Sequence, residues 1–149
     1  DDAFVGYEDA ILQALCFGWI DGPVRSFDER IGGLWFAPRR ASSGWAATNK
    51  ARIALLEAQG LLEEAGIRAI EVAKANGSWT VLDGPEAGIE PDDLTAALDA
   101  SPAARAGWDA FPPGARKIAL TQIAMAKRAE TRAARIAKFV ADAAEGRRP

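Results

Sequence analysis

Apolar residues recur at helical spacing along most of the chain, with one interruption rich in aromatic and β-branched residues. Apolar positions three and four residues apart are typical of a helix with one buried face. This spacing predicts helices over residues 7–17, 46–59, 62–75, 91–98, 102–111 and 115–144. The interruption predicts two short strands, near 19–26 and 33–38, with turns at Asp21-Gly22 and Gly32-Gly33.

Capping residues agree with these boundaries. Ser101-Pro102 joins a cap residue to a proline at the first position of the helix over 102–111. Asn76-Gly77 ends the helix over 62–75. We therefore predict an α+β fold that is predominantly α-helical and ends in a long C-terminal helix. A small antiparallel sheet near 19–38 should pack under several helices. In the helix over 62–75, the residues expected in the core are Ile67, Ile70 and Val72.

The length of 149 residues is that of one domain, so we expect a single domain over 1–149. No stretch approaches the roughly 20 apolar residues that span a bilayer. The first residues are acidic and no apolar signal segment follows them, which favours a cytoplasmic protein. Because the chain does not begin with methionine, we expect that it lacks a native N-terminal segment.

The chain has no histidine and a single cysteine, Cys16. These counts exclude an intramolecular disulfide, a cysteine-based zinc site and the Ser-His-Asp and Cys-His catalytic pairs. We therefore expect no metal ion and no cofactor. Acid–base chemistry near neutral pH would require a carboxylate, a lysine, Tyr7 or Cys16 with a shifted pKa.

Residues 15–22 are the densest group of candidate functional side chains. Cys16, Trp19 and Asp21 meet at the junction of a helix and a strand, where side chains can point into a cleft. In one interpretation Asp21 is a general base or a ligand acceptor and Cys16 is a nucleophile. In the other, which we favour, Cys16 and Trp19 are core residues and Asp21 caps a turn. No histidine is available to ionise the thiol.

Residues 38–49 combine two arginines, two serines and the start of a helix. An arginine guanidinium and the free N–H groups at a helix start both bind anions. This pattern makes the segment with Arg39 and Arg40 a candidate anion site. The alternative is structural: Arg39 forms an ion pair inside the fold, with Asp21 or Asp28, and one of the two serines caps the helix.

The net charge is −3, but basic residues are concentrated between Arg116 and Lys138, where Glu130 is the only acid. A basic amphipathic helix can bind phosphate backbones or anionic membranes. The side chains available for such a surface are Lys127, Arg128, Arg132, Arg135 and Lys138. We favour a solvated face or intramolecular ion pairs, because the whole chain is acidic and this helix is poor in aromatic residues. Nucleic acid is therefore not the expected partner.

Three motifs, taken in order, resemble one family. They are Ala14-Leu15-Cys16-Phe17-Gly18-Trp19-Ile20-Asp21-Gly22, then Pro38-Arg39-Arg40 with Ser43-Gly44-Trp45 and Asn49, then Ala126-Lys127 with Glu130-Thr131-Arg132 and Arg135-Ile136. They are similar to the YdeI/OmpD-associated family, also called bacteriocin-protection proteins, and residues 91–146 resemble its OmdA domain. Family members carry a further segment before the first helix, and a serine where this chain has Ala46. The resemblance implies a small bacterial protein linked to bacteriocin resistance, without catalytic residues to transfer.

Three functions follow as hypotheses. The first is a non-enzymatic accessory protein for stress resistance that binds a small anionic molecule or another protein. The residues expected at its site are Asp21, Arg25, Arg39, Trp45 and Asn49. The second is an enzyme that uses Asp21 as acid or base, with Arg39 orienting an anionic substrate. The third is binding to an anionic polymer or membrane through the basic helix over 127–138. The ligand and the oligomeric state stay open.

Overall fold

The computed structural model describes residues 5–26 and 32–149. It groups the chain into two compact units, an N-terminal unit that ends at Trp79 and a C-terminal unit that begins at Thr80. The described residues are mostly helical with one small antiparallel sheet, which confirms the predicted α+β class. Each unit has a hydrophobic core of its own, and the expectation of one domain over 1–149 stays a prediction.

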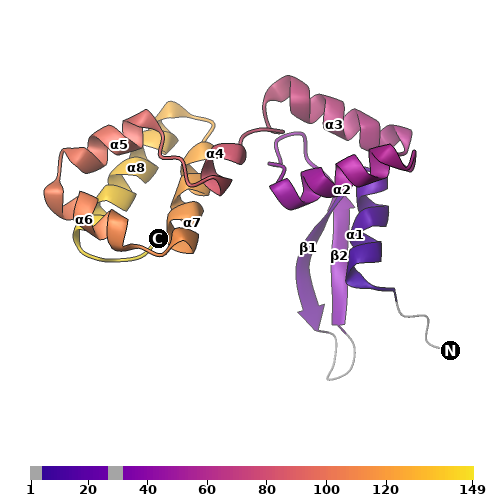
Figure 1. Ribbon diagram of the computed structural model, residues 1–149, viewed down its shortest axis with the longest axis horizontal. Coiled ribbons are helices and arrows are strands. Elements are labelled where there is room, and N and C mark those ends of the chain that lie inside the picture. The colour runs from indigo at the N-terminus through magenta and orange to yellow at the C-terminus, as the bar shows by residue number, and fades with distance from the viewer. Residues whose placement is uncertain (1–4, 27–31) are drawn as a thin grey trace. The chain divides into compact units, whose positions relative to one another are not determined.

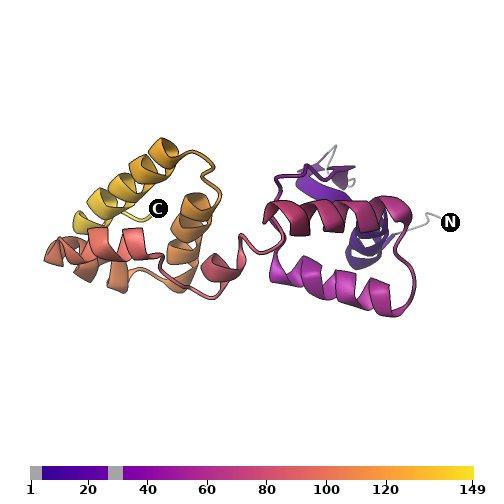
Figure 2. The ribbon, with the colours of Figure 1, turned by 90° about the horizontal axis from the view of Figure 1, so that it is seen from above.

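The N-terminal unit packs a β-hairpin against three helices (Figure 1). Its elements are α1 (Tyr7–Cys16), β1 (Trp19–Ser26), β2 (Gly32–Pro38), α2 (Ala47–Ala58) and α3 (Glu64–Asn76). Both strands lie where the sequence predicts them. Figure 2 shows α2 and α3 running in opposite directions on either side of the turn at Gly60, whose φ is +67°. The core includes Ile11, Leu15, Trp45, Ile53, Leu56 and Ile70.

The two strands pair antiparallel, with Arg25 opposite Gly33. The pairing is irregular between Asp21 and Val24. Pro23 lies in this segment and has no N–H to donate to the ladder, which accounts for the bulge. The predicted turns are therefore wrong: Asp21-Gly22 lies at the bulge inside β1, and Gly32-Gly33 begins β2.

Helix α3 packs through Ile70 together with two small residues, Gly66 and Ala73. Gly66 lies so close to the end of α1 that a Cβ there would be 2.2 Å from the carbonyl oxygen of Cys16. Gly66, Ile70 and Ala73 share this buried face at helical spacing. Ile70 is buried as predicted, but Ile67 and Val72 are exposed because they lie outside this face.

The C-terminal unit is built from helices. Its elements are α4 (Asp83–Glu86), α5 (Asp92–Asp99), α6 (Pro102–Ala110), α7 (Pro113–Ala124) and α8 (Ala129–Ala144). Helix α8 contacts α5, α6 and α7, and α4 lies against α7. Ser101 caps α6, its hydroxyl accepting from the N–H of Ala104 at 3.3 Å, as the sequence predicts. The core includes Leu94, Leu98, Trp108, Leu120, Ile123 and Phe139.

The single long helix predicted over 115–144 is wrong. Helix α7 ends at Ala124, and α8 begins at Ala129 after a short connection. This connection contains neither proline nor glycine, so the sequence has no local signal for the break. The break allows Ile123 of α7 and Phe139 of α8 to share one core. Ile118, an apolar residue of α7, is exposed.

Among the residues that the structure describes, no helix combines the length and the apolar composition that crossing a membrane requires.

Candidate functional site

The five residues predicted at one site all lie in the N-terminal unit, but they are distributed over three places. Arg39 and Trp45 contact each other at a cavity. Asp21 and Asn49 belong to a polar cluster that also involves α1 and α2. Arg25 lies elsewhere on the hairpin, where it lines a small pocket. Only the first two residues therefore share a surface that is hollow enough for a ligand.

Arg39 follows β2 and is held from several sides. Its backbone N–H donates to the carbonyl of Gly18 at 2.9 Å, and its Nη1 donates to the carbonyl of Gly44 at 2.8 Å. The guanidinium carbon lies 3.9 Å from the centre of the Trp45 ring, which is a cation–π contact. These contacts keep a positive charge in a half-buried position against a core tryptophan.

Half of the guanidinium of Arg39 has no partner. Nε and Nη2 are buried, and neither donates a hydrogen bond to any described residue. Together they form the edge of a guanidinium that holds a carboxylate through two parallel hydrogen bonds. Burial lowers the pKa of Arg39 to about 10, although the negative charge of Asp21 raises it. Arg39 is therefore still charged at neutral pH, with two donors left over.

The structural alternative for this segment named an ion pair of Arg39 with Asp21 or Asp28 and a serine cap on the helix. The negative charge of Asp21 raises the pKa of Arg39. In the described part of the chain, however, no ion pair joins the two side chains, and Nε and Nη2 of Arg39 have no hydrogen-bond partner. Asp28 lies outside the described residues. The predicted serine cap is wrong, because α2 begins after Ala46 and has no side-chain cap.

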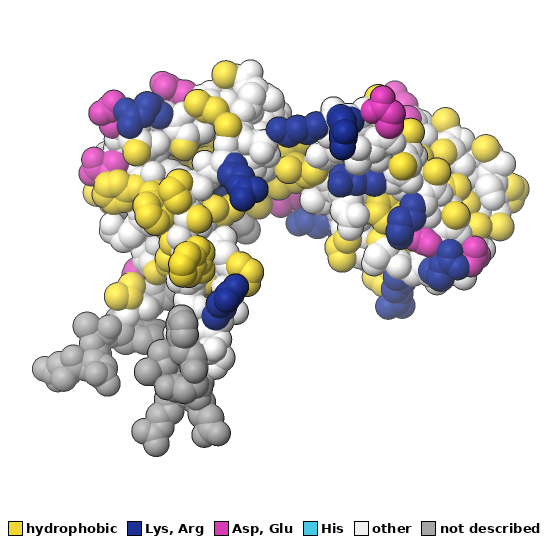
Figure 3. All heavy atoms as spheres, turned by 180° about the vertical axis from the view of Figure 1, so that it is seen from behind, with side chains coloured by type: hydrophobic (Ala, Val, Ile, Leu, Met, Phe, Trp, Pro, Cys, Tyr) yellow, Lys and Arg dark blue, Asp and Glu magenta, His cyan; other side chains and the backbone are white. Residues whose placement is uncertain are grey.

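Arg39 lines a cavity of about 400 Å³ in the N-terminal unit. One wall comes from α3, and Phe17 lies at the end of α1 on another side. Arg40 and Arg68 also line the cavity; Arg68 pairs with Glu64, but both side chains are exposed, so their pairing is weak. Figure 3 shows hydrophobic side chains gathered over one face of this unit, with lysine and arginine side chains among them. The cavity thus combines apolar walls with three cationic groups.

A second cluster of polar side chains contains Asp21 and Asn49. The hydroxyl of Tyr7 donates to Oδ2 of Asp21 at 3.2 Å. Arg52 donates to both carboxylate oxygens of Glu8, at 2.7 and 2.6 Å, and to Oδ1 of Asn49 at 2.8 Å. The negative charge of Asp21 raises the pKa of the exposed Tyr7, which stays a donor at neutral pH. Neither Asp21 nor Asn49 is among the residues that line the Arg39 cavity.

The basic residues predicted as an anion-binding surface are largely engaged within the C-terminal unit. Arg132 donates to both oxygens of Asp93, at 2.6 and 2.8 Å. Lys138 pairs with Asp142 on the next turn of α8. Acidic and basic residues are equally numerous in the C-terminal unit, so its basic helix is balanced by neighbouring acids.

Two arginines of this surface also donate hydrogen bonds to carbonyl groups at the C-terminal end of α7. Arg132 donates to the carbonyl of Ile123 at 3.2 Å, and Arg135 donates to the carbonyl of Gln122. These carbonyls lie in the last turn of α7, where helical carbonyls have no intrahelical partner. Lys127 and Arg128, in the connection before α8, are exposed.

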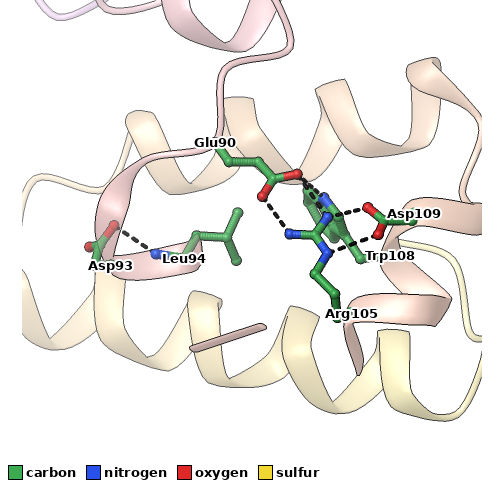
Figure 4. A network of polar contacts seen from close by, with 6 residues as sticks. All are labelled: Glu90, Asp93, Leu94, Arg105, Trp108 and Asp109. Carbon is green, nitrogen blue, oxygen red and sulfur yellow. Dashed lines mark hydrogen bonds and ion pairs between the residues drawn. The ribbon is translucent and has the colours of Figure 1, made fainter. Parts of the chain in front are cut away.

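Sequence reasoning missed a polar network in the C-terminal unit (Figure 4). Arg105 donates to both oxygens of Glu90, at 2.7 and 3.0 Å, and Nε1 of Trp108 donates to Oε1 of Glu90 at 2.7 Å. Arg105 also pairs with Asp109 one turn along α6. Trp108 is fully buried, so its N–H requires an acceptor. The only signal in the sequence was the helical spacing of the α6 residues, which says nothing of Glu90.

Replacing Glu90 by glutamine should lower the free energy of unfolding at pH 7 by about 2 kcal/mol, because two charge-assisted hydrogen bonds are weakened. Hydrogen bonding from Arg105 lowers the pKa of Glu90 below its ordinary value of 4.5. The stabilisation is therefore complete above about pH 4.5 and is lost as the pH falls through the lower folded-state pKa. Urea unfolding at pH 7 and pH 3 should show that the difference between wild type and variant narrows in acid.

The matched control for this prediction is Asp99→Asn, at the exposed end of α5. It should change the free energy of unfolding by less than about 0.5 kcal/mol at pH 7. A Glu90→Gln variant as stable as wild type at pH 7 would contradict the role assigned to the network.

The described residues bring together no group of three or more acidic or cysteine side chains that could hold a metal ion.

Two family models match separate parts of the chain. The model described as Bacteriocin-protection, YdeI or OmpD-Associated (OmdA) matches residues 88–146, which include Glu90 and helices α5 to α8. A model described as a domain of unknown function (DUF8412) matches residues 1–69, which include the hairpin and Arg39. No curated protein and no solved structure matches the chain. The OmdA match confirms the resemblance predicted for the C-terminal part, whereas the same resemblance for residues 7–87 stays a prediction.

Proposed function

We propose that this chain, whose residues 88–146 belong to the OmdA (Bacteriocin-protection, YdeI or OmpD-Associated) family, is a bacterial accessory protein that binds a small anionic ligand through Arg39. The observation that carries the proposal is the unpartnered edge of the Arg39 guanidinium at a cavity in the N-terminal unit. A cytoplasmic location and a role in resistance to bacteriocins are part of the same proposal, and the description of the family supports the second.

The physical argument begins with the cost of a buried charge. A guanidinium that leaves water loses its hydration, and each donor left without an acceptor costs about 1–3 kcal/mol. Arg39 recovers part of this cost from the carbonyl of Gly44 and from the ring of Trp45. An anion that accepts from Nε and Nη2 would recover the rest. The cavity beside Arg39 has room for such an anion, and Arg40 and Arg68 add to its positive potential.

The two other hypotheses have less support. The enzyme hypothesis requires Asp21 in the ligand cavity, but Asp21 lies with Tyr7 in the neighbouring polar cluster. The polymer or membrane hypothesis requires a free basic face on α8, but Arg132, Arg135 and Lys138 have partners inside the C-terminal unit. The Arg39 cavity is therefore the site on which to test function first.

A panel of small carboxylates and phosphates should contain compounds that raise the melting temperature of the wild type but not of Arg39→Gln. A ligand at a hundredfold excess over its dissociation constant adds about 2.7 kcal/mol of apparent stability, which a thermal-shift assay detects readily. Glutamine removes the charge and the paired donors but keeps a polar side chain. The matched control is Arg25→Gln, since Arg25 lines a different pocket, and it should respond as the wild type does.

Two outcomes would remove the proposal: compounds that shift wild type and Arg39→Gln equally, or a panel in which no compound shifts the wild type. If compounds shift the wild type alone, survival of bacteria that express either form, measured after exposure to a bacteriocin, shows whether the site serves the protective role.

A further inference from the structure

We propose that the ligand of the Arg39 cavity is a single carboxylate on an elongated apolar body, the chemistry of a medium-chain fatty acid. This inference rests on the proposed function and adds the chemical class of the ligand. It comes from the distribution of charged and apolar side chains around the cavity, from the length of the apolar wall and from the number of donors that Arg39 offers.

The wall that α3 contributes carries a row of methyl groups, with the charged side chain of Arg68 beside it. Ala65, Ala69 and Ala73 line the cavity at intervals of four residues, so they form one row along the helix. This row extends over about 12 Å at the helical rise of 1.5 Å per residue. Phe17 and Val72 also line the cavity, although they are 49% and 45% exposed. Large apolar side chains that stay exposed beside a cavity favour an apolar ligand over a polar one.

The positive charge comes mainly from a different element. Arg39 and Arg40 are neighbours in the segment after β2, whereas the alanine row belongs to α3. A ligand that lies between the two elements therefore meets Arg39 and Arg40 on one side, and on the other the methyl groups of the α3 row with Arg68 beside them. This arrangement selects a molecule with one charged end and a long apolar part, and a compact polar anion would leave the apolar wall uncovered.

The donors of Arg39 favour a carboxylate over a phosphate. Nε and Nη2 are two parallel donors, which match the two oxygens of one carboxylate. A phosphate would bring a third oxygen and a second charge to a cavity whose α3 wall carries a row of methyl groups, and the negative charge of Asp21 already acts on Arg39. Because both nitrogens are buried, the ligand reaches them only when side chains at the rim move aside. Among the residues that line the cavity, Phe17 and Val72 are exposed.

The test is calorimetric titration of the whole chain with butanoate, hexanoate and octanoate. Each added methylene that packs against the apolar wall should lower the dissociation constant about three- to fourfold. Octanol and succinate are the matched probes, one without the carboxylate and one without the apolar chain, and both should bind at least about tenfold more weakly than octanoate. The signal of the Arg39 Nε–H in a nitrogen–proton NMR spectrum, assigned with Arg39→Lys, should shift with octanoate.

Two variants separate the apolar wall from the charge. Val72→Asp places a negative charge at the cavity. It should lower the affinity for octanoate at least about tenfold, by repulsion and by loss of apolar contact. Ile67→Asp is the control, because Ile67 is similarly exposed on the same helix but does not line the cavity. It should leave the affinity for octanoate unchanged within about twofold.

The failure of this inference can be told from the failure of the proposed function. If succinate or inorganic phosphate binds as tightly as octanoate and loses affinity in Arg39→Gln, the anion site stands and its assignment to a fatty-acid-like ligand is overturned. The same holds if only a peptide with an apolar C-terminal residue binds through Arg39. If no anion depends on Arg39, both proposals fail together.

Discussion

Replacing Trp45 by alanine should lower the free energy of unfolding of the N-terminal unit by about 4 kcal/mol. Trp45 is 1% exposed and packs on Trp79 with ring centres 5.0 Å apart, and the guanidinium of Arg39 lies against its ring. Truncation removes a large buried side chain, leaves a cavity and withdraws the aromatic support of Arg39. Urea unfolding followed by circular dichroism measures the loss, and hydrogen exchange shows which unit opens.

Trp35 is the matched control for Trp45. It lies on β2 with 67% of its surface exposed, so Trp35→Ala should change the free energy of unfolding by less than about 0.5 kcal/mol. Trp45→Phe retains an aromatic ring under Arg39 and should lose less stability than Trp45→Ala. Equal and small losses for Trp45→Ala and Trp35→Ala would show that Trp45 is not a core residue and would weaken the case for the Arg39 site.

Replacing Gly107 by alanine should lower the free energy of unfolding of the C-terminal unit by about 3 kcal/mol. A Cβ at Gly107 would lie 1.9 Å from the carbonyl oxygen of Ala143, so α6 and α8 cannot keep their present separation. The clash is with backbone atoms, which cannot rotate away as a side chain can. The two helices must move apart, and the core that includes Trp108 and Phe139 loses packing. Urea unfolding measures the effect, with hydrogen exchange in α6 and α8 as the local readout.

Gly114 offers the same substitution without the clash. It lies in the first turn of α7, and nothing lies within 4 Å of the Cβ that alanine would add. Gly114→Ala should therefore raise the free energy of unfolding by about 0.5 kcal/mol, because alanine is the better helix former. If Gly107→Ala is as stable as Gly114→Ala, the close packing of α6 on α8 is not a property of the folded protein.

The boundaries that the sequence predicted correctly are those set by local chemistry. Ser101 followed by Pro102 starts a helix, because a hydroxyl and a fixed φ suit its first turn. Gly77 ends α3 with a φ of +80°, which glycine adopts without strain. The break between α7 and α8 has no such residue, so only the packing of α8 against its neighbours decides it.

The candidate site was predictable only in part for a related reason. The sequence named Arg39 among the candidate anion-binding residues, because a guanidinium next to polar residues is recognisable without a fold. The row of alanines on α3 was invisible, since small residues carry no chemistry until the helix is placed beside Arg39. Asp21, Asn49 and Arg25 were grouped with Arg39 because two motifs flank one predicted sheet, but strand register and helix packing place them elsewhere.

The sequence by itself determined the α+β class, both strands and the residue types that chemistry near neutral pH can use, since these follow from periodicity, capping and composition. It also predicted the resemblance of residues 91–146 to the OmdA domain, which the match of the family model to residues 88–146 confirms. Only the tertiary structure decided which donors of Arg39 stay unpaired. It also decided which arginines donate to the last carbonyls of α7, and that Glu90 accepts a hydrogen bond from Trp108. Each of these depends on contacts between elements, which the order of residues along one element does not specify.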